Sequence, residues 1–211
     1  MADPEVLADS EVLADPAALA DPLETAILDA AAECVLAFGV RRTSLSDIAR
    51  RAGVSRPTVY RRWPDLTSLV ADLMTREWLA TFAAAEPDRA GFATVREHAV
   101  RSLVAICAAL RGHPLLRKII DVDPELLQPY IFDRLGTGQR LARQIIAERI
   151  TDGQRDGSVR AGDPALLSLM VLLTVQSFVF SGRVDTLTAG PRADAELAEL
   201  LDRYLRPAAT A

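Results

Sequence analysis

The stretch from Thr43 to Trp63, TSLSDIARRAGVSRPTVYRRW, most limits what this chain can fold into, because it encodes two short helices joined by a tight turn. Ser44 is a preferred N-cap with Asp47 following in the first turn, and apolar residues recur behind it at helical spacing, which predicts a first helix. Gly53 can adopt the positive φ that a sharp turn after a helix needs. Ser55 can then cap a second helix, so the stretch predicts a helix-turn-helix.

The second of these helices has an outward face suited to nucleic acid. A helix turns by about 100° per residue. If Val59 points toward the crossing of the two helices, the residues that face outward are Pro57, Thr58, Tyr60 and Arg61. Arginine can hold guanine through two hydrogen bonds, and hydroxyl groups donate to phosphate oxygens. Seven arginines and one acid lie between Arg41 and Trp63, a local net charge of +6. A solvated basic helix pair is the alternative, but the ordered cap, turn glycine and wedge valine favour DNA binding.

Residues 25 to 78 resemble the N-terminal domain of TetR-type transcriptional regulators. The resemblance rests on a helix that ends in Phe38 and Gly39 and on the run TSLSDIARRAGVSRPTVYRRWPDLTSLV. It implies a dimeric, all-helical DNA-binding protein, usually a repressor that a small molecule releases. Thr67 departs from the pattern, because the family commonly carries a phosphate-binding lysine early in the fourth helix. A hydroxyl and a helix N-terminus can also hold a phosphate.

Ten residues are therefore expected at the DNA interface. One short recognition helix offers few contacts, so we expect a dimer on a palindromic duplex operator. The ten residues are Thr43, Ser44, Ser55, Arg56, Pro57, Thr58, Tyr60, Arg61, Trp63 and Thr67.

The net charge of −5 for the 211 residues conceals an uneven distribution. Residues 1 to 22 hold six acids and no base, in a threefold hexad PEVLAD, SEVLAD, PAALAD. Such a segment is too short and too acidic for a solenoid and predicts a disordered tail over residues 1 to 20. The tail could compete with DNA for the basic surface. Because the local field attracts DNA, the acidic total does not exclude DNA binding.

The pattern after the tail predicts an all-α fold of about nine helices, since no segment alternates with period two. A DNA-binding domain is expected over residues 21 to 80, and a ligand-binding and dimerisation domain over residues 81 to 211. Asp21 and Pro22 open the first helix, and Asp65 caps the fourth. The later helices are expected at about Arg89 to Arg111, after Pro114, from Asp123 to Asp152 with a break near Gly136 and Gly138, after Asp163, and at about Ala193 to Leu205.

The last two helices are expected to form the dimer interface. The helix from Ala165 to Gly182 is apolar nearly all round, more than one core face requires. The final helix has one apolar stripe, formed by Leu197, Leu200, Leu201, Tyr204 and Leu205. Packing within one subunit is the alternative. The long apolar stretch also approaches membrane length, but Ser168, Thr174, Gln176 and Ser177 interrupt it, so no membrane partner is expected.

The second domain is expected to bind a small apolar or amphipathic effector among its helices. The candidate residues are Trp78, Phe82, Arg101, Cys107, Phe132, Gln176 and Phe180, each of which is also compatible with an ordinary core position. Arg101 and Gln176 stand out, because polar groups inside a bundle need partners.

No catalytic chemistry is predicted. The glycine spacings of nucleotide-binding loops and the G-x-S-x-G motif do not occur. His98 and His113 have no cysteine or acid at metal-ligand spacing, and Asp123, Glu125 and Asp133 are expected to cap helices or face solvent. Cys34 and Cys107 lack paired spacing, which indicates reduced core thiols. We expect no enzyme, no cofactor and no metal, and a cytoplasmic location, because no signal-peptide pattern opens the chain.

The function implied by the resemblance is a homodimeric repressor, in which an effector shifts the fourth helix and changes the separation of two recognition helices. Two alternatives remain open. The first is a helical ligand-binding protein or enzyme that has kept the fold without DNA function, which a missing salt dependence of duplex binding would reveal. The second is an architectural DNA binder without an effector, which a defined palindrome would argue against.

Overall fold

The computed structural model describes residues 21–182, 184 and 190–208, and all regular elements in this part of the chain are helical. Its α-helices are α2 (Pro22–Phe38), α3 (Leu45–Arg51), α4 (Arg56–Arg62), α5 (Leu66–Ala85), α6 (Val95–Gly112), α7 (Pro114–Val122), α8 (Thr137–Arg155), α9 (Pro164–Ser181) and α10 (Pro191–Leu205). The all-α prediction is confirmed. The predicted tail, residues 1 to 20, lies outside the described residues.

The chain divides into two compact units. The first comprises the chain up to Ala83 together with Pro114–Arg134, and the second comprises Ala84–His113 and the chain from Leu135 onward. The division near residue 83 lies close to the expected domain boundary at residue 80. The first unit also takes in α7, which the sequence analysis placed in the second domain.

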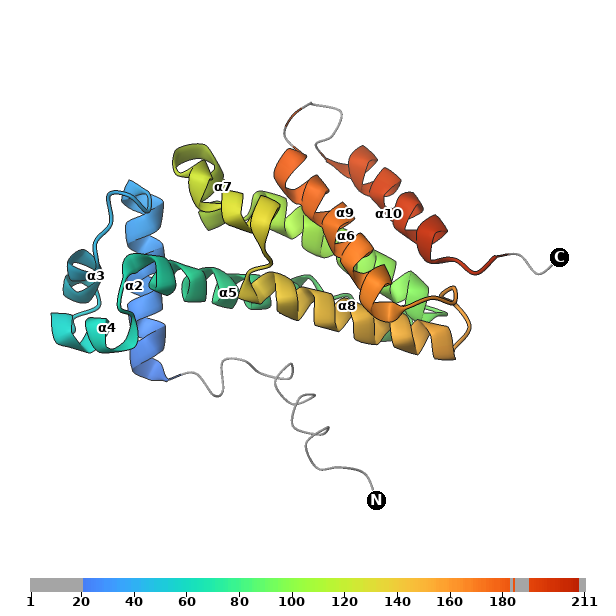
Figure 1. The fold of residues 1–211 in the computed structure, drawn as a ribbon, viewed down its shortest axis with the longest axis horizontal. Helices are drawn as coiled ribbons and strands as arrows, with labels where there is room; N and C mark the ends of the chain where they lie inside the picture. The colour runs from blue at the N-terminus through green and yellow to red at the C-terminus, as the bar shows by residue number, and fades with distance from the viewer. Residues whose placement is uncertain (1–20, 183, 185–189, 209–211) are drawn as a thin grey trace, which may run out of the picture. The chain divides into compact units, whose positions relative to one another are not determined.

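The core of the first unit explains why α7 joins it. Leu115 and Ile119 of α7 are buried in the same cluster as Ile27 of α2, Ile48 of α3 and Leu69 of α5. Figure 1 shows α2 beside α3 and α4. Burying each such side chain contributes roughly 1.5–3 kcal/mol, so five of them from four helices fix the relative positions of those helices.

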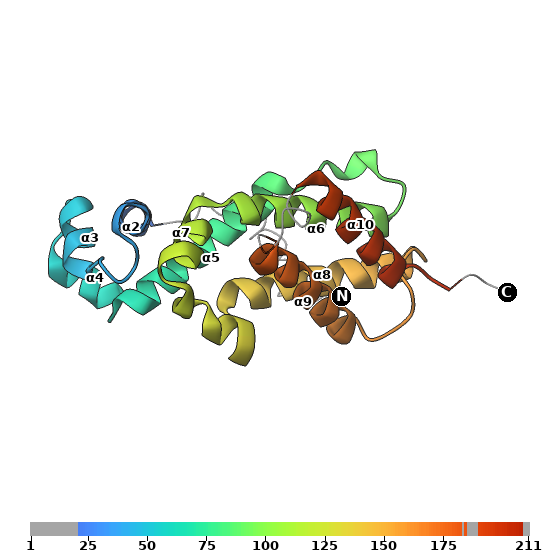
Figure 2. The ribbon, with the colours of Figure 1, turned by 90° about the horizontal axis from the view of Figure 1, so that it is seen from above.

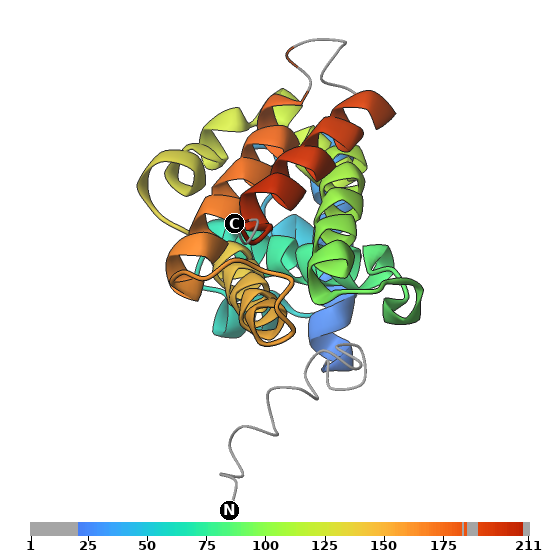
Figure 3. The ribbon, with the colours of Figure 1, turned by 90° about the vertical axis from the view of Figure 1, so that its right-hand side faces the viewer.

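The second unit is a bundle of α6, α8, α9 and α10. The helix α9 packs against α8 and α6, and α10 packs mainly against α6 (Figures 2 and 3). The predicted apolar stripe of α10 is buried at Leu197, Leu201 and Leu205, but Leu200 is exposed. The bundle therefore has a core of its own.

Two predicted helices have different bounds in the structure. The helix expected from Arg89 begins at Val95, because a 3-10 turn (η1, Arg89–Gly91) precedes Thr94, whose hydroxyl accepts the Glu97 N–H at 3.2 Å and caps α6. The helix expected from Asp123 begins at Thr137. Residues before it form a 3-10 turn (η2, Pro124–Leu126) and a π-type turn (η3, Pro129–Asp133), because two prolines interrupt regular backbone hydrogen bonding.

Among the described helices, α9 alone is by itself long and apolar enough to cross a membrane, with a mean hydropathy of 1.8 over Pro164–Ser181. One third of that stretch is buried within the chain. The buried face carries Val171, Val175 and Val179, and the opposite face carries exposed Leu166 and Met170. A helix with two apolar faces is equally typical of a subunit interface.

Candidate nucleic-acid interface

The helix-turn-helix is built by two serine caps and one glycine. The Ser44 hydroxyl accepts the Asp47 N–H at 3.1 Å and caps α3, while donating to the Asp47 carboxylate at 2.6 Å. That hydrogen bond holds the pKa of Asp47 below its usual value. Gly53 has φ +68°, and Ser55 accepts the Thr58 N–H at 3.3 Å, so the turn leads directly into α4. The predicted helix-turn-helix is confirmed.

Val59 orients α4. Its side chain is 0% exposed in the core between the two helices, as the sequence analysis expected. The opposite side of α4 consequently faces outward, where Tyr60 is 50% exposed and Arg56, Pro57 and Arg61 are exposed. Thr58 is half-buried and its hydroxyl lies 2.7 Å from that of Ser55. These residues form one surface, which we call the α4 face: Arg56, Pro57, Tyr60 and Arg61.

Two residues expected at the interface, Thr43 and Trp63, have buried side chains that bind other parts of the first unit. The Thr43 hydroxyl donates to the Gly39 carbonyl at 2.8 Å, closing the turn between α2 and α3. The Trp63 indole N–H donates to the Asp72 carboxylate at 2.8 Å, tying the end of α4 to α5. Both side chains therefore support the α4 face from inside. Ser44, Ser55 and Thr67 lie at the surface.

Ion pairs reduce the local charge of the predicted basic patch. Four of its seven arginines meet acids, several of them from distant parts of the first unit: Arg41 with Asp123 and Glu125, Arg50 with Asp47, Arg51 with Glu33, and Arg62 with Asp21 and Glu24. Within the described residues, Arg42, Arg56 and Arg61 have no such acidic neighbour. Two of these three lie on the α4 face, so the uncompensated charge is concentrated where a duplex would bind.

Asp123 is a structural residue that the sequence analysis misassigned. Its side chain makes no helix-capping hydrogen bond and is 1% exposed, so the expectation of a capping or solvated acid was wrong. Its Oδ2 accepts the Val40 N–H at 2.8 Å, and its Oδ1 lies 3.7 Å from Arg41 Nε. The pairing is invisible in local sequence because 83 residues separate Asp123 from Val40.

The candidate effector residues are distributed over both units. Trp78, Phe82 and Phe132 belong to the first unit, whereas Arg101, Cys107, Gln176 and Phe180 belong to the second. Arg101 is exposed and Phe132 is 78% exposed, so neither occupies the interior position that was expected. In the second unit the Gln176 carbonyl accepts from the Gln139 amide at 2.5 Å, joining α9 to α8. Cys107 is buried, and desolvation raises the pKa of its thiol to about 11.

His98 is buried and hydrogen-bonded within the second unit. Its Nδ1 lies 2.8 Å from an Arg149 guanidinium nitrogen, which can only donate. Nε2 therefore carries the proton and donates to the Pro87 carbonyl at 3.0 Å. Glu86 lies beside both, 2.6 Å from Arg149. This cluster fixes the segment between α5 and α6 against α6 and α8.

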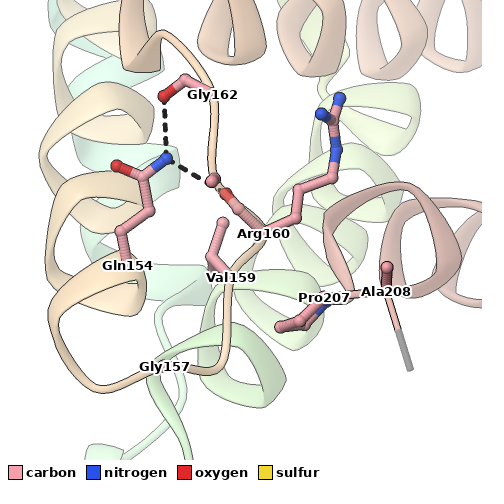
Figure 4. Close-up of a pocket in the computed structure, with 8 residues that line it drawn as sticks. Gln154, Gly157, Val159, Arg160, Gly162, Pro207 and Ala208 are labelled. Carbon is pink, nitrogen blue, oxygen red and sulfur yellow. Dashed lines mark hydrogen bonds between the residues drawn. The ribbon is translucent and has the colours of Figure 1, made fainter. Parts of the chain in front are cut away.

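An open pocket of about 720 Å³ lies beside the turn between α8 and α9 (Figure 4). The Gln154 amide donates to the carbonyls of Arg160 and Gly162 at 3.1 and 2.9 Å. The Arg160 guanidinium lies 4.6 Å from the centre of the Tyr204 ring and donates to the Tyr204 carbonyl at 2.7 Å. Because these polar groups already bind one another, the pocket is an unfavourable effector site.

Fold and site together define a class of protein: a helix-turn-helix DNA-binding protein with a second, helical unit. The family model described as bacterial regulatory proteins, tetR family, matches residues 27–73. An uncharacterized HTH-type transcriptional regulator of Mycobacterium bovis is 43% identical over 180 residues, which cover 85% of this chain and 92% of that relative. The chain belongs to the TetR family and is a DNA-binding transcriptional regulator.

Solved structures show the same fold. The transcriptional repressor QsdR of R. erythropolis, from the TetR family, has a TM-score of 0.65 at 16% identity over 87% of this chain and 94% of its own. The regulator FadR of Bacillus subtilis in complex with stearoyl-CoA has a TM-score of 0.59 at 20% identity over 86% of this chain and 99% of its own. At these identities the likeness concerns the fold.

Proposed function

We propose that this regulator is a cytoplasmic homodimeric repressor that binds a palindromic operator through the α4 face and is released by a small amphipathic effector. The single observation that carries the proposal is that Arg56 and Arg61 are exposed and, among the described residues, have no acidic neighbour, whereas Arg41, Arg50, Arg51 and Arg62 form ion pairs. An arginine without an acidic neighbour can meet a phosphate or a guanine edge without first losing an ion pair.

The roles proposed for the α4 face follow from the chemistry of its side chains. Arg61 reads a guanine edge in the major groove, where guanine offers two acceptors. Tyr60 donates its hydroxyl to a phosphate, and Thr67 does so at the first turn of α5, in place of a lysine. Ser44 and Ser55 lie at the surface, where their hydroxyls add to the contacts with the duplex backbone.

Dimerisation is supported by an apolar stripe along the outer face of α9. Leu166, Met170 and Leu173 recur at helical spacing and are 43% to 56% exposed. On α10, Leu200 is 46% exposed, and α10 contacts α9. Pairing these helices with those of a second copy buries the α9 stripe and Leu200 in a four-helix interface. In such a dimer each α4 must fit one of two half-sites about 34 Å apart, one duplex turn.

An amphipathic effector is supported by the character of the second unit and by one relative. The Gln139–Gln176 amide pair lies in a bundle that is otherwise largely apolar around Cys107 and Val175. FadR has the same fold and is described in complex with stearoyl-CoA, so this architecture can hold a ligand with a long apolar chain and a polar head. The curated relatives carry the names of transcriptional regulators, and we propose no enzymatic activity for this chain.

The test of the proposal is footprinting of the purified protein on DNA flanking its own gene. We expect protection of a palindrome whose half-sites are about one turn apart. Long-chain acyl-CoA, added as a probe, is expected to weaken that protection and to raise the thermal stability of the protein. Protection that is uniform along the DNA would contradict operator recognition. A defined footprint that acyl-CoA leaves unchanged would contradict the proposed effector class alone.

A further inference from the structure

We propose that the acidic hexad segment, residues 1 to 20, docks on the α4 face and competes there with DNA. The inference rests on the proposed function, because it adds regulation to the same surface. The described end of the repeat already contacts an arginine of α4, next to the α4 face. Asp21, the last residue of the third hexad PAALAD, forms an ion pair with Arg62 at the end of α4.

The environment of Asp21 shows how the repeat meets the helix. Its Oδ1 accepts the Leu23 N–H at 2.9 Å, and its Oδ2 contacts Arg62. The backbone hydrogen bond with Leu23, and then Arg62, hold the pKa of Asp21 below its usual value, so the contact carries a full negative charge at neutral pH. Glu24 lies 3.4 Å from the same guanidinium. Two carboxylates at the start of the described chain, those of Asp21 and Glu24, therefore lie beside Arg62 at the end of α4.

Charge complementarity extends the contact toward residue 1. The hexads place further acids before Asp21, at Asp3, Glu5, Asp9, Glu11 and Asp15, with no basic residue among them. The α4 face offers Arg56 and Arg61, which have no acidic neighbour among the described residues. The segment thus supplies the opposite charge that these two arginines lack.

The segment is also long enough. An extended chain advances about 3.3 Å per residue, so Asp15 can lie up to about 20 Å from Asp21. The helix α4, Arg56–Arg62, rises only about 1.5 Å per residue, or roughly 9 Å in all. Two hexads are therefore sufficient to cover the α4 face, and the linkage to Asp21 keeps them at a high local concentration.

Docking of this segment would weaken DNA binding without abolishing it. Exposed ion pairs are individually weak, so several acids together give an expected reduction in duplex affinity of about 5- to 10-fold at low salt. The reduction is expected to disappear at high salt, because screening weakens exposed pairs. It also makes the salt dependence of DNA binding shallower, since the tail already neutralises part of the charge.

The first experiment measures duplex affinity by fluorescence anisotropy from 50 to 500 mM salt. The test variant neutralises four tail acids, by Glu5→Gln, Asp9→Asn, Glu11→Gln and Asp15→Asn. A matched control neutralises four exposed acids of the second unit, Glu148, Asp152, Glu196 and Glu199, in the same way. We expect tighter low-salt binding and a steeper salt slope for the tail variant than for the control. Equal affinities and slopes for the two variants would overturn the proposal.

A second readout needs no DNA and therefore separates tail docking from the proposed function. A nitroxide is attached to Ser10→Cys, since Cys34 and Cys107 are buried. We expect paramagnetic broadening of the backbone amides of α4 at 50 mM salt and its loss at 500 mM. Broadening without duplex binding would sustain the docking and refute the operator proposal. An α4 that shows no broadening at low salt would refute the docking, whatever the DNA result.

Discussion

Asp123 accepts the backbone N–H of Val40 at 2.8 Å from a position that is 1% exposed, across 83 residues of sequence. This hydrogen bond joins the end of α7 to the turn between α2 and α3. The same turn holds Thr43, whose hydroxyl closes it onto Gly39. The segment from Pro114 to Arg134 thereby becomes a structural support of the helix-turn-helix, although it follows α6 in the sequence.

Removal of the Asp123 carboxylate should destabilise the first unit. Asp123→Ala leaves the buried Val40 N–H without its acceptor, and we expect a loss of about 1–3 kcal/mol in the free energy of unfolding. Asp123→Asn keeps an acceptor oxygen and should lose less. Denaturant titrations of both variants measure the difference. An alanine variant as stable as the native protein would show that the hydrogen bond is unimportant.

Gly39 is expected to tolerate no side chain. Its φ is +83°, and a Cβ there would lie 2.9 Å from Asp123 Oδ2 and 3.0 Å from Val122 Cγ1. Gly39→Ala should therefore cost more than about 1 kcal/mol of unfolding free energy. Gly112→Ala is the matched control, because this residue of α6 has open space around it and alanine favours helix. Equal effects of the two substitutions on the thermal midpoint would show that a side chain at Gly39 causes no strain.

Arg61 and Tyr60 should differ in how they affect sequence preference. Arg61→Ala is expected to cost about 1–3 kcal/mol on the preferred operator and to relax base preference at one position. Tyr60→Phe is expected to weaken binding to all duplexes alike. Competition binding with operators that vary at single positions distinguishes the two patterns. Arg155→Ala, an exposed arginine of α8, serves as the control and should change neither.

The apolar stripe of α9 should determine the oligomeric state. A double substitution, Met170→Lys with Leu173→Lys, places like charges in the proposed interface, where burial without a partner is unfavourable. We expect light scattering after gel filtration to give the mass of a monomer for this variant and of a dimer for the native chain. Gln144→Lys, at an exposed position of α8, is the control and should remain dimeric. A native monomer would refute the proposed interface.

The buried thiol of Cys107 makes stability fall at high pH. Its pKa is raised from 9.0 to about 11 in the folded protein, so the unfolded chain loses the proton first. The unfolded state is then stabilised as the pH rises from about 9 to 11, and unfolding becomes more favourable. Denaturant titrations across this range should show a smaller decline for Cys107→Ala than for the native protein. Equal losses of stability in the two proteins would show that a group other than Cys107 causes the pH dependence.

The sequence predicted the local elements of the interface well and its long-range contacts poorly. Ser44, Gly53, Ser55 and Val59 act within a few residues of one another, so their roles follow from capping, turn and periodicity rules. The burial of Asp123 depends on contacts between segments far apart in the chain. No local pattern encodes that.

The partners of the arginines were missed for the same reason. The local count of +6 included no acids from α2 or from the 114–134 segment, which neutralise Arg51, Arg62 and Arg41. Likewise, Thr43 and Trp63 have the residue types of DNA contacts, and only the fold shows that their polar groups bond to Gly39 and Asp72.

The central claim is that the α4 face carries the charge that binds DNA. Its most direct test is the slope of log K against log salt concentration for duplex binding, compared between the native protein and Arg56→Ala with Arg61→Ala. We expect a steep negative slope for the native protein, and a slope shallower by about one to two for the double variant, because each phosphate contact contributes about 0.9. A native slope near zero, or an identical slope for the double variant, would contradict the claim.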